Sequence, residues 1–307
     1  MKKLLALILV ALLVCSLAAC GSEEDLIDQN NKENQVISEY VYEDFLYSVN
    51  EAGDYEIVGY IYGGTELQDV VIPEEIDGRP VTGIGKDAFK ACKNIRSVTL
   101  TSNITYIGEY AFYDCDYITE IEIPESVTVL SEGVLQNCDR LETVTLPDTL
   151  KEIGAYALKD STALTDITLP EGLTTVGTGA FNGCTALTSV TVPTTVTTVG
   201  DAAFFGCTAL KNITVLGDAL KEIGKAVFDS IATDAEFTVT EGTAFDTYAK
   251  ENGYIEDPTA PEGPTDPEGP TDPDDPTDPD DPTEPENPTL GNQGAELTSS
   301  YGPLTKF

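Results

Sequence analysis

A 23-residue repeat in the middle of the chain constrains the fold more than any other feature of the sequence. The slot filled by Ile84-Gly85 recurs five times at steps of 23 residues and once more after 24. The recurrences are Ile107-Gly108, Leu130-Ser131, Ile153-Gly154, Val176-Gly177, Val199-Gly200 and Ile223-Gly224. Each unit reads approximately I-G-x-x-A-F-x-x-C-x-x-L-x-x-V-x-L-P-x-x-V-x-x. A repeat of this length predicts a stack of similar units.

The two halves of the unit have different hydrophobic periods. Apolar residues alternate with polar ones in pairs such as Val98 and Leu100, which predicts a strand with one buried face. A proline follows this strand directly in four units and ends it, because proline cannot donate a hydrogen bond to the ladder. In the other half, Phe89 and Cys92 are three residues apart, as on one side of a helical turn. We therefore expect one short strand and one helical or 3-10 turn in each unit.

A unit this short cannot bury its apolar side alone, so neighbouring units must stack on each other. The expected fold class is an α/β solenoid with a parallel β-sheet on one face and short helical or 3-10 turns on the other. Capping elements are expected at both ends. Apolar residues around the turn at 51–54 predict a hairpin over 45–62. A helix over 244–252, ended by Gly253, is predicted to close the other end.

The repeat resembles the BspA-like, or treponemal-type, leucine-rich repeat family over residues 55–254. The resemblance rests on the I-G-x-x-A-F-x-x-C and L-x-x-V-x-L-P signatures, which match over six or seven units. It implies a leucine-rich repeat solenoid. It also implies a role in adhesion, host-protein binding or cell–cell interaction at a bacterial surface.

The first twenty residues resemble a bacterial lipoprotein signal. Two lysines precede an apolar run from Leu4 to Leu17, and Leu17-Ala18-Ala19-Cys20 has the arrangement of a lipobox. An uncleaved anchor is disfavoured, because positions 4–19 fall short of the roughly 20 residues that a spanning helix needs. The resemblance implies cleavage before Cys20 and a lipid on its sulfur. The mature chain would then be attached to the outer face of a bacterial cell membrane.

Five segments are therefore expected along the chain. They are a signal peptide (1–19), a flexible acidic tether (20–40), the repeat domain with its caps (41–254), a Pro/Asp/Glu/Thr-rich spacer (255–289) and a C-terminal tail (290–307). In the spacer, eleven prolines recur at every third residue, which is the period of a polyproline II helix. Repulsion among its carboxylates favours an extended spacer.

Composition excludes several functional classes. The chain has 54 Asp and Glu, 16 Lys and Arg and no His, for a net charge of −38. Without histidine, Ser-His-Asp or Cys-His catalysis and His-ligated metals are excluded. A surface this negative repels the phosphates of nucleic acid. We expect a monomeric protein that is not an enzyme and that needs no cofactor or metal.

One repeat slot holds a column of cysteines. Its members are Cys92, Cys115, Cys138, Cys184 and Cys207. A metal array would need C-x-x-C pairs or histidines, which this slot lacks. Disulfides between neighbouring units are conceivable by distance, but side chains in one column point the same way. We expect buried, reduced thiols, because Ser161 and Ile231 fill the same slot in other units.

The predicted strands contain one candidate catalytic pair. Glu120 and Glu122 are two residues apart, so both carboxylates leave the same face of a strand, as a glycoside hydrolase would require. A solenoid supplies no evident cleft that would raise one of the two pKa values. Solvated strand residues are the better interpretation.

An outward row of strand residues is the main candidate binding surface. The row consists of Thr99, Glu122, Thr145, Thr168, Thr191 and Thr214. In register, these side chains would form a polar strip suited to an extended partner, and solenoids commonly bind through such a face. Threonine also favours strands and keeps a sheet soluble, so both interpretations stay open.

The sequence thus predicts a lipid-anchored cell-surface repeat protein that mediates protein–protein contacts or host and cell adhesion. Its partner would be an extracellular protein or a glycan, and the membrane would be reached through the lipid on Cys20. The alternative is a carbohydrate-binding lipoprotein for glycan capture or cell-wall attachment. The chain has no Trp for stacking on sugars, but Tyr110, Tyr113 and Tyr117 are candidates for that role.

Overall fold

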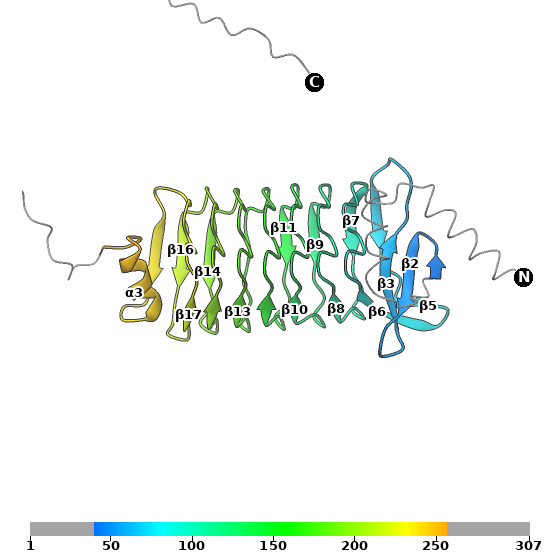
Figure 1. Ribbon diagram of the computed structural model, residues 1–307, viewed down its shortest axis with the longest axis horizontal. Coiled ribbons are helices and arrows are strands. Elements are labelled where there is room, and N and C mark those ends of the chain that lie inside the picture. The colour runs from blue at the N-terminus through cyan, green and yellow to red at the C-terminus, as the bar shows by residue number, and fades with distance from the viewer. Residues whose placement is uncertain (1–39, 257–307) are drawn as a thin grey trace, which may run out of the picture. The chain divides into compact units, whose positions relative to one another are not determined.

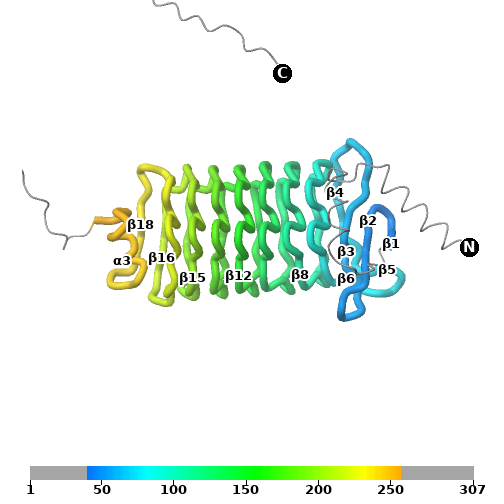
Figure 2. The backbone as a smooth tube through the Cα atoms, in the orientation of Figure 1, coloured from blue at the N-terminus to red at the C-terminus, as the bar shows by residue number. Residues whose placement is uncertain are grey.

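Each 23-residue unit folds into one coil of a parallel β-solenoid (Figures 1 and 2). The structure is a computed structural model that describes residues 40–256. The signal peptide with Cys20, nearly all of the tether, the spacer beyond residue 256 and the C-terminal tail lie outside these residues. The predicted solenoid is confirmed. Each coil has three sides, and two of them differ from the prediction.

The predicted strand half of the unit forms the first sheet. Its strands are β4 (Gln68–Val71), β7 (Ile95–Thr99), β9 (Glu120–Glu122) and β11 (Thr143–Thr145), followed by β14 (Ser189–Val192), β16 (Asn212–Val215) and β18 (Glu236–Val239). All neighbours pair in parallel, and the pairs from β9 to β11 and from β14 to β16 join residues 23 apart. The coil between β11 and β14 has no assigned strand on this side. The first sheet therefore has two parts.

A second parallel sheet, which the sequence analysis did not predict, is built from the I-G slots. Its strands are β6 (Arg79–Ile84), β8 (Tyr106–Ile107), β10 (Val129–Leu130), β12 (Glu152–Ile153), β13 (Thr175–Val176), β15 (Thr198–Val199) and β17 (Glu222–Ile223). Figure 1 shows these strands as a row separate from that of the first sheet. Most of them have two residues, which is too short to show an alternating pattern.

The A-F-x-x-C segment forms the third side of the coil, and it is not helical. The backbone N–H groups of Asp87, Phe89 and Ala91 donate to carbonyl oxygens of the next coil, at N–O distances of 3.0, 2.8 and 2.7 Å. The N–H groups between them donate to carbonyl oxygens three residues earlier in the same coil, as that of Lys90 does to the oxygen of Asp87 at 3.0 Å. Both Asp87 and Ala91 have left-handed backbones, with φ of 56° and 57°. We call this arrangement the turn ladder, and the predicted helical or 3-10 turn is not confirmed.

The glycine of the I-G slot is explained by contact between backbones. A Cβ atom on Gly177 would lie 2.6 Å from the carbonyl carbon of Gly154 and 2.7 Å from the nitrogen of Ala155. Ser131 is the exception in this slot, and its hydroxyl donates to the carbonyl oxygen of Ile107. The second sheet is interrupted at this coil, between β8 and β10.

The core is a set of columns that run along the solenoid. Phe204 stacks on Phe181 and on Phe228, with ring centroids 5.0 and 5.2 Å apart and planes within 2°. Leu135 and Leu158 occupy the same slot in the two middle coils and are fully buried. Since every coil contributes to the same columns, one continuous core extends from cap to cap.

Both predicted caps are present. At the N-terminal end, β1 (Tyr40–Tyr42), β2 (Phe45–Val49) and β3 (Tyr55–Tyr60) form an antiparallel sheet, and β3 pairs in parallel with β6. The hairpin of β5 (Glu75–Ile76) and β6 adds to this end. At the other end, α3 (Ala244–Glu251) is the single helix of residues 40–256. Its Phe245 ring covers Phe228, the last ring of the column, with centroids 5.9 Å apart.

Candidate functional site

The first sheet presents the predicted outward row to solvent. Its strands alternate between buried residues such as Val144 and exposed residues such as Thr145. Five members of the row are exposed and Thr214 is half-buried. Parallel pairing places Glu122 opposite Thr145 and Thr191 opposite Thr214. The backbone of the first sheet thus brings the predicted residues into register, except that Thr168 lies in the coil without an assigned strand.

The outward row is longer than predicted. Val71, whose surface is 62% exposed, pairs with Thr99 at one end, and Thr238 pairs with Thr214 at the other. Both belong to the incomplete units near the caps. Both residues occupy the same position in the repeat as the predicted members, and this position could have identified them from the sequence.

A groove of about 400 Å³ opens on the first sheet where its strand ladder is interrupted. It lies between β11 and the following coil and is lined by residues 142–146, Asp148, Thr165, Asp166, Thr168 and Pro170. Two members of the outward row, Thr145 and Thr168, line it. This strand-face groove could not be predicted from the sequence, because the strand half of the repeat pattern continues through the coil in which the pairing fails.

The groove and the strands beside it have an acidic character. Glu142, Asp148 and Asp166 line the groove, and Glu120 and Glu122 are exposed on the neighbouring strand β9. Glu120 and Glu122 share one face, as predicted, and that face is the open surface of the sheet. The groove therefore offers hydroxyls and carboxylates to a partner.

Basic residues of this region pair with carboxylates of neighbouring coils. On the first sheet, Arg96 of β7 forms an ion pair with Asp69 of β4. The hydrogen bonds from Arg96 and from Ser97 lower the pKa of Asp69 to about 2. Farther along, Lys211 pairs with Asp234 at 2.6 Å. These pairs neutralise the cations and leave the excess of carboxylates to set the charge of the surface.

The cysteine column is a structural feature of the core. Cys115, Cys138, Cys184 and Cys207 are buried and free, which confirms the prediction for these four. Cys92 fills the same buried slot but is not one of the free thiols, so the prediction is not confirmed for it.

Each of the four free thiols donates a hydrogen bond to a carbonyl oxygen of the preceding coil. Cys115 bonds to the oxygen of Phe89 at 3.0 Å, and the hydroxyl of Ser161 bonds to that of Leu135 at 2.9 Å. This shared bond explains why serine can replace cysteine in the slot. Desolvation by burial raises the pKa of Cys138 to about 12, which keeps its thiol protonated and unreactive.

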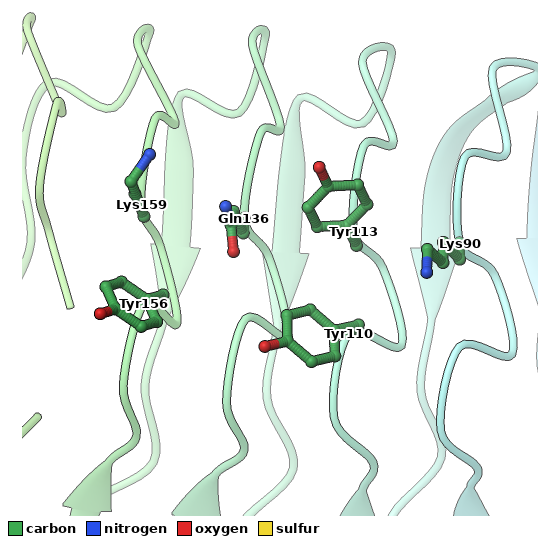
Figure 3. Close-up of a pocket in the computed structure, with 6 residues that line it drawn as sticks. All are labelled: Lys90, Tyr110, Tyr113, Gln136, Tyr156 and Lys159. Atoms are coloured by element: carbon green, nitrogen blue, oxygen red, sulfur yellow. The ribbon is translucent and has the colours of Figure 1, made fainter. Parts of the chain in front are cut away.

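A second depression, of about 620 Å³, lies over the turn ladder. Figure 3 shows the six residues that line it: Lys90, Tyr110, Tyr113, Gln136, Tyr156 and Lys159. Tyr110 and Tyr113 are two of the three tyrosines proposed from sequence. The third, Tyr117, lies outside this depression and stacks against Arg140, with the guanidinium 4.5 Å from the ring centroid. Tyr156, from a coil farther along, was missed.

Within residues 40–256, no group of three or more His, Cys, Asp or Glu side chains is arranged to hold a metal ion. In the same part of the chain, no helix has the length and apolar character to span a membrane.

Comparison with known proteins identifies one family. The BspA type leucine rich repeat region matches residues 55–185 and 151–263, in six copies. No curated protein matches the sequence significantly.

Solved structures of bacterial leucine-rich repeat proteins resemble the solenoid. A leucine-rich repeat protein of T. pallidum is 26% identical, with a TM-score of 0.59, over 71% of this chain and 97% of that one. A leucine-rich repeat protein from Bacteroides ovatus is 23% identical, with a TM-score of 0.48, over 66% and 67% of the two chains. A leucine rich cell surface protein from Faecalibacterium prausnitzii is 15% identical, with a TM-score of 0.41, over 71% and 98%.

Proposed function

The chain belongs to the BspA-type leucine-rich repeat family, and from this premise we propose that it is a non-catalytic binding protein displayed on a bacterial cell surface. Its partner is an extracellular protein. The outward row on the first sheet is the surface that binds it.

The observation that carries this proposal is the groove that crosses the outward row. Side chains along the row repeat at the spacing of parallel strands, about 4.8 Å. An extended polypeptide segment can meet hydroxyls and carboxylates at regular intervals along such a row. The groove at Thr145 and Thr168 adds a depression of about 400 Å³ that can receive a side chain. The acidic lining favours a partner segment that contains Lys or Arg.

Surface display in this proposal rests on the N-terminal sequence. The lipobox Leu17-Ala18-Ala19-Cys20 would be cleaved before the cysteine, whose sulfur would then receive a lipid. The acidic tether that follows would separate the solenoid from the membrane. Replacing Cys20 by Ala should move the protein from the membrane fraction to the soluble fraction and abolish incorporation of labelled fatty acid. Unchanged membrane retention and labelling would contradict the lipid anchor.

The binding surface is tested by adding bulk and positive charge to the outward row. Purified mature protein is screened against an array of extracellular matrix proteins and glycans, and affinities for the matrix proteins that bind are then measured. Combining Thr145→Lys, Thr168→Lys and Thr191→Lys should weaken binding by at least about tenfold, because the new side chains fill the groove and repel a basic partner.

A matched control is available on another side of the coil. Thr128 is an exposed threonine next to β10 of the second sheet, so Thr128→Lys adds the same group away from the outward row. This variant should bind as the unmodified protein does. Equal affinity of the triple variant and the unmodified protein would place the site elsewhere. An array that gives signals with glycans alone would contradict a protein partner.

A further inference from the structure

The depression over the turn ladder has the composition of a ligand site and lies on a different side of the coil from the outward row. We call it the tyrosine-lysine site, and it consists of Lys90, Tyr110, Tyr113, Gln136, Tyr156 and Lys159. Among residues 40–256, no Asp or Glu side chain lines the depression, and Asp87, Glu132 and Asp160 bond to residues that do line it. A lining of aromatic rings, amines and one amide therefore interrupts an otherwise acidic surface.

The repeat arranges these residues in two rows, as Figure 3 shows. Tyr110 and Tyr156 occupy one slot of the repeat, two coils apart. Lys90, Tyr113, Gln136 and Lys159 occupy another slot in four successive coils. At about 4.8 Å per coil, the two tyrosines of the first row are about 10 Å apart along the solenoid.

Glycines in the alternate coils make room for the rings of the first row. A Cβ atom on Gly133 would lie 2.3 Å from Cε1 of Tyr110, and one on Gly179 would lie 2.7 Å from the same atom of Tyr156. Each ring thus extends over the backbone of the next coil. Because the covered coil has no side chain at this slot, no Cβ atom stands between each ring and the backbone beneath it. The side chain of Tyr156 remains 37% exposed.

The rings of Tyr110 and Tyr113 are held in place before any ligand arrives. The hydroxyl of Tyr110 donates to the carboxylate of Glu132, and this bond raises the pKa of Tyr110 to about 12. The rings of Tyr110 and Tyr113 meet edge to face, with centroids 6.0 Å apart. Ordering these two tyrosines in advance lowers the entropy cost of binding.

The charges of the two lysines are compensated locally. Lys90 pairs with Asp87 at 3.1 Å and lies 5.6 Å from the ring centroid of Tyr113. Lys159 pairs with Asp160. The lysines therefore act as hydrogen-bond donors in a site without net positive charge. Since the whole chain carries a charge of −38, this site favours a neutral ligand over an anionic one.

From this geometry we propose that the tyrosine-lysine site binds a neutral, extended, β-1,4-linked glycan. Sugar rings have apolar faces that stack on aromatic side chains, and hydroxyls that accept hydrogen bonds from amines and amides. In an extended β-1,4-linked chain, every second sugar presents the same face, at a repeat close to the distance between Tyr110 and Tyr156. The row of Lys90, Gln136 and Lys159 lies alongside as donors to the hydroxyls.

The test uses full-length mature protein and two neutral probes, cellohexaose and chitohexaose, in calorimetric titrations. At least one probe should bind, and Tyr156→Ala should weaken that binding by about tenfold, equivalent to about 1.4 kcal/mol. Tyr156→Phe keeps the stacking ring and should stay within about threefold of the unmodified protein. A hexamer of β-1,4-linked mannuronic acid, which is anionic, should bind more weakly than the better neutral probe.

Matched controls separate this site from other surfaces. Tyr117→Ala removes a tyrosine outside the site, and Thr145→Lys combined with Thr168→Lys alters only the outward row, so both should leave glycan binding unchanged. Circular dichroism verifies that each variant is folded. The proposal is overturned if neither neutral probe binds, if Tyr156→Ala binds as well as the unmodified protein, or if the anionic hexamer binds most tightly. None of these results bears on protein binding by the outward row.

Discussion

At the scale of single residues, several slots of the repeat are set by contacts with the neighbouring coil. The glycine of the I-G slot has no room for a Cβ, because backbone atoms of the preceding coil lie within 3 Å of where it would be at Gly154 and Gly177. The cysteine slot requires a small side chain with a proton to donate to a buried carbonyl oxygen. Thiols and the hydroxyl of Ser161 both meet that requirement.

Replacing Gly177 by Ala should lower the free energy of unfolding by about 2–3 kcal/mol, the upper part of the range of about 1–3 kcal/mol that an extra group in a packed interior typically costs. The new Cβ would lie 2.6 Å from a backbone carbonyl carbon, which cannot rotate away as a side chain can. Urea unfolding monitored by circular dichroism measures the change. Ser131→Ala is the control, because that slot already holds a Cβ and loses only one hydrogen bond, worth about 1 kcal/mol. A loss for Gly177→Ala no larger than that of the control would contradict this explanation.

At the scale of elements, each side of a coil is stabilised by hydrogen bonds to the next coil. The three-residue spacing of the A-F-x-x-C segment suggested a helical turn, since a helix also places residues three apart on one side. The structure instead sends alternate N–H groups of this segment to the next coil. The left-handed backbone at both ends of the segment allows these N–H groups to point toward the next coil. Rings such as Phe181 and Phe204 then stack directly, because the same register holds every coil.

The stacked phenylalanine column leads to a prediction at this scale. Phe204→Ala should lower the free energy of unfolding by about 3–5 kcal/mol, because it leaves a cavity between two rings. Phe204→Leu should cost about 1–2 kcal/mol, since leucine already fills this slot at Leu135 and Leu158.

The adjacent residue provides a control for the column. Phe205 is 38% exposed, so Phe205→Ala should change stability by less than about 0.5 kcal/mol. Equal urea midpoints for Phe204→Ala and Phe205→Ala would show that stacking in the column contributes nothing.

At the scale of the whole described solenoid, stability depends on interfaces between coils and on the two caps. Each coil buries its apolar side only against its neighbours, and the aromatic clusters at the caps cover the two ends of the core. Ion pairs such as Lys86 with Glu109 (2.9 Å) also join adjacent coils. Deprotonation of the buried thiols in four coils is linked to unfolding, because the coils must separate before any of these thiols meets solvent.

The buried thiols predict a loss of stability at alkaline pH. Burial raises the pKa of Cys138 and of Cys207 to about 12, above the ordinary value of 9.0. The native state therefore keeps protons that the unfolded state loses above pH 9. This contribution to stability is complete below pH 9 and is lost as the pH rises toward 12. The urea midpoint should be lower at pH of about 10.5 than at pH of about 8.

Serine at the same positions provides the control for the pH effect. A variant with Cys138→Ser and Cys207→Ser has no thiol to titrate there, so its urea midpoint should fall less between the two pH values. Equal decreases in the variant and the unmodified protein would assign the pH dependence to other groups, such as Tyr60, whose pKa burial raises to about 12.

The sequence by itself determined the repeat length, the buried columns, most strands of the first sheet, the caps and six members of the outward row. These features follow from the periodicity of apolar and polar side chains, which can be read directly from the sequence. Only the tertiary structure decided the second sheet, the turn ladder, the strand-face groove and the addition of Tyr156 to the tyrosine-lysine site. The reason is that each of these depends on a partner in a neighbouring coil. Two-residue strands are too short to show a period, and the strand half of the repeat pattern continues unchanged through the coil in which the strand pairing fails.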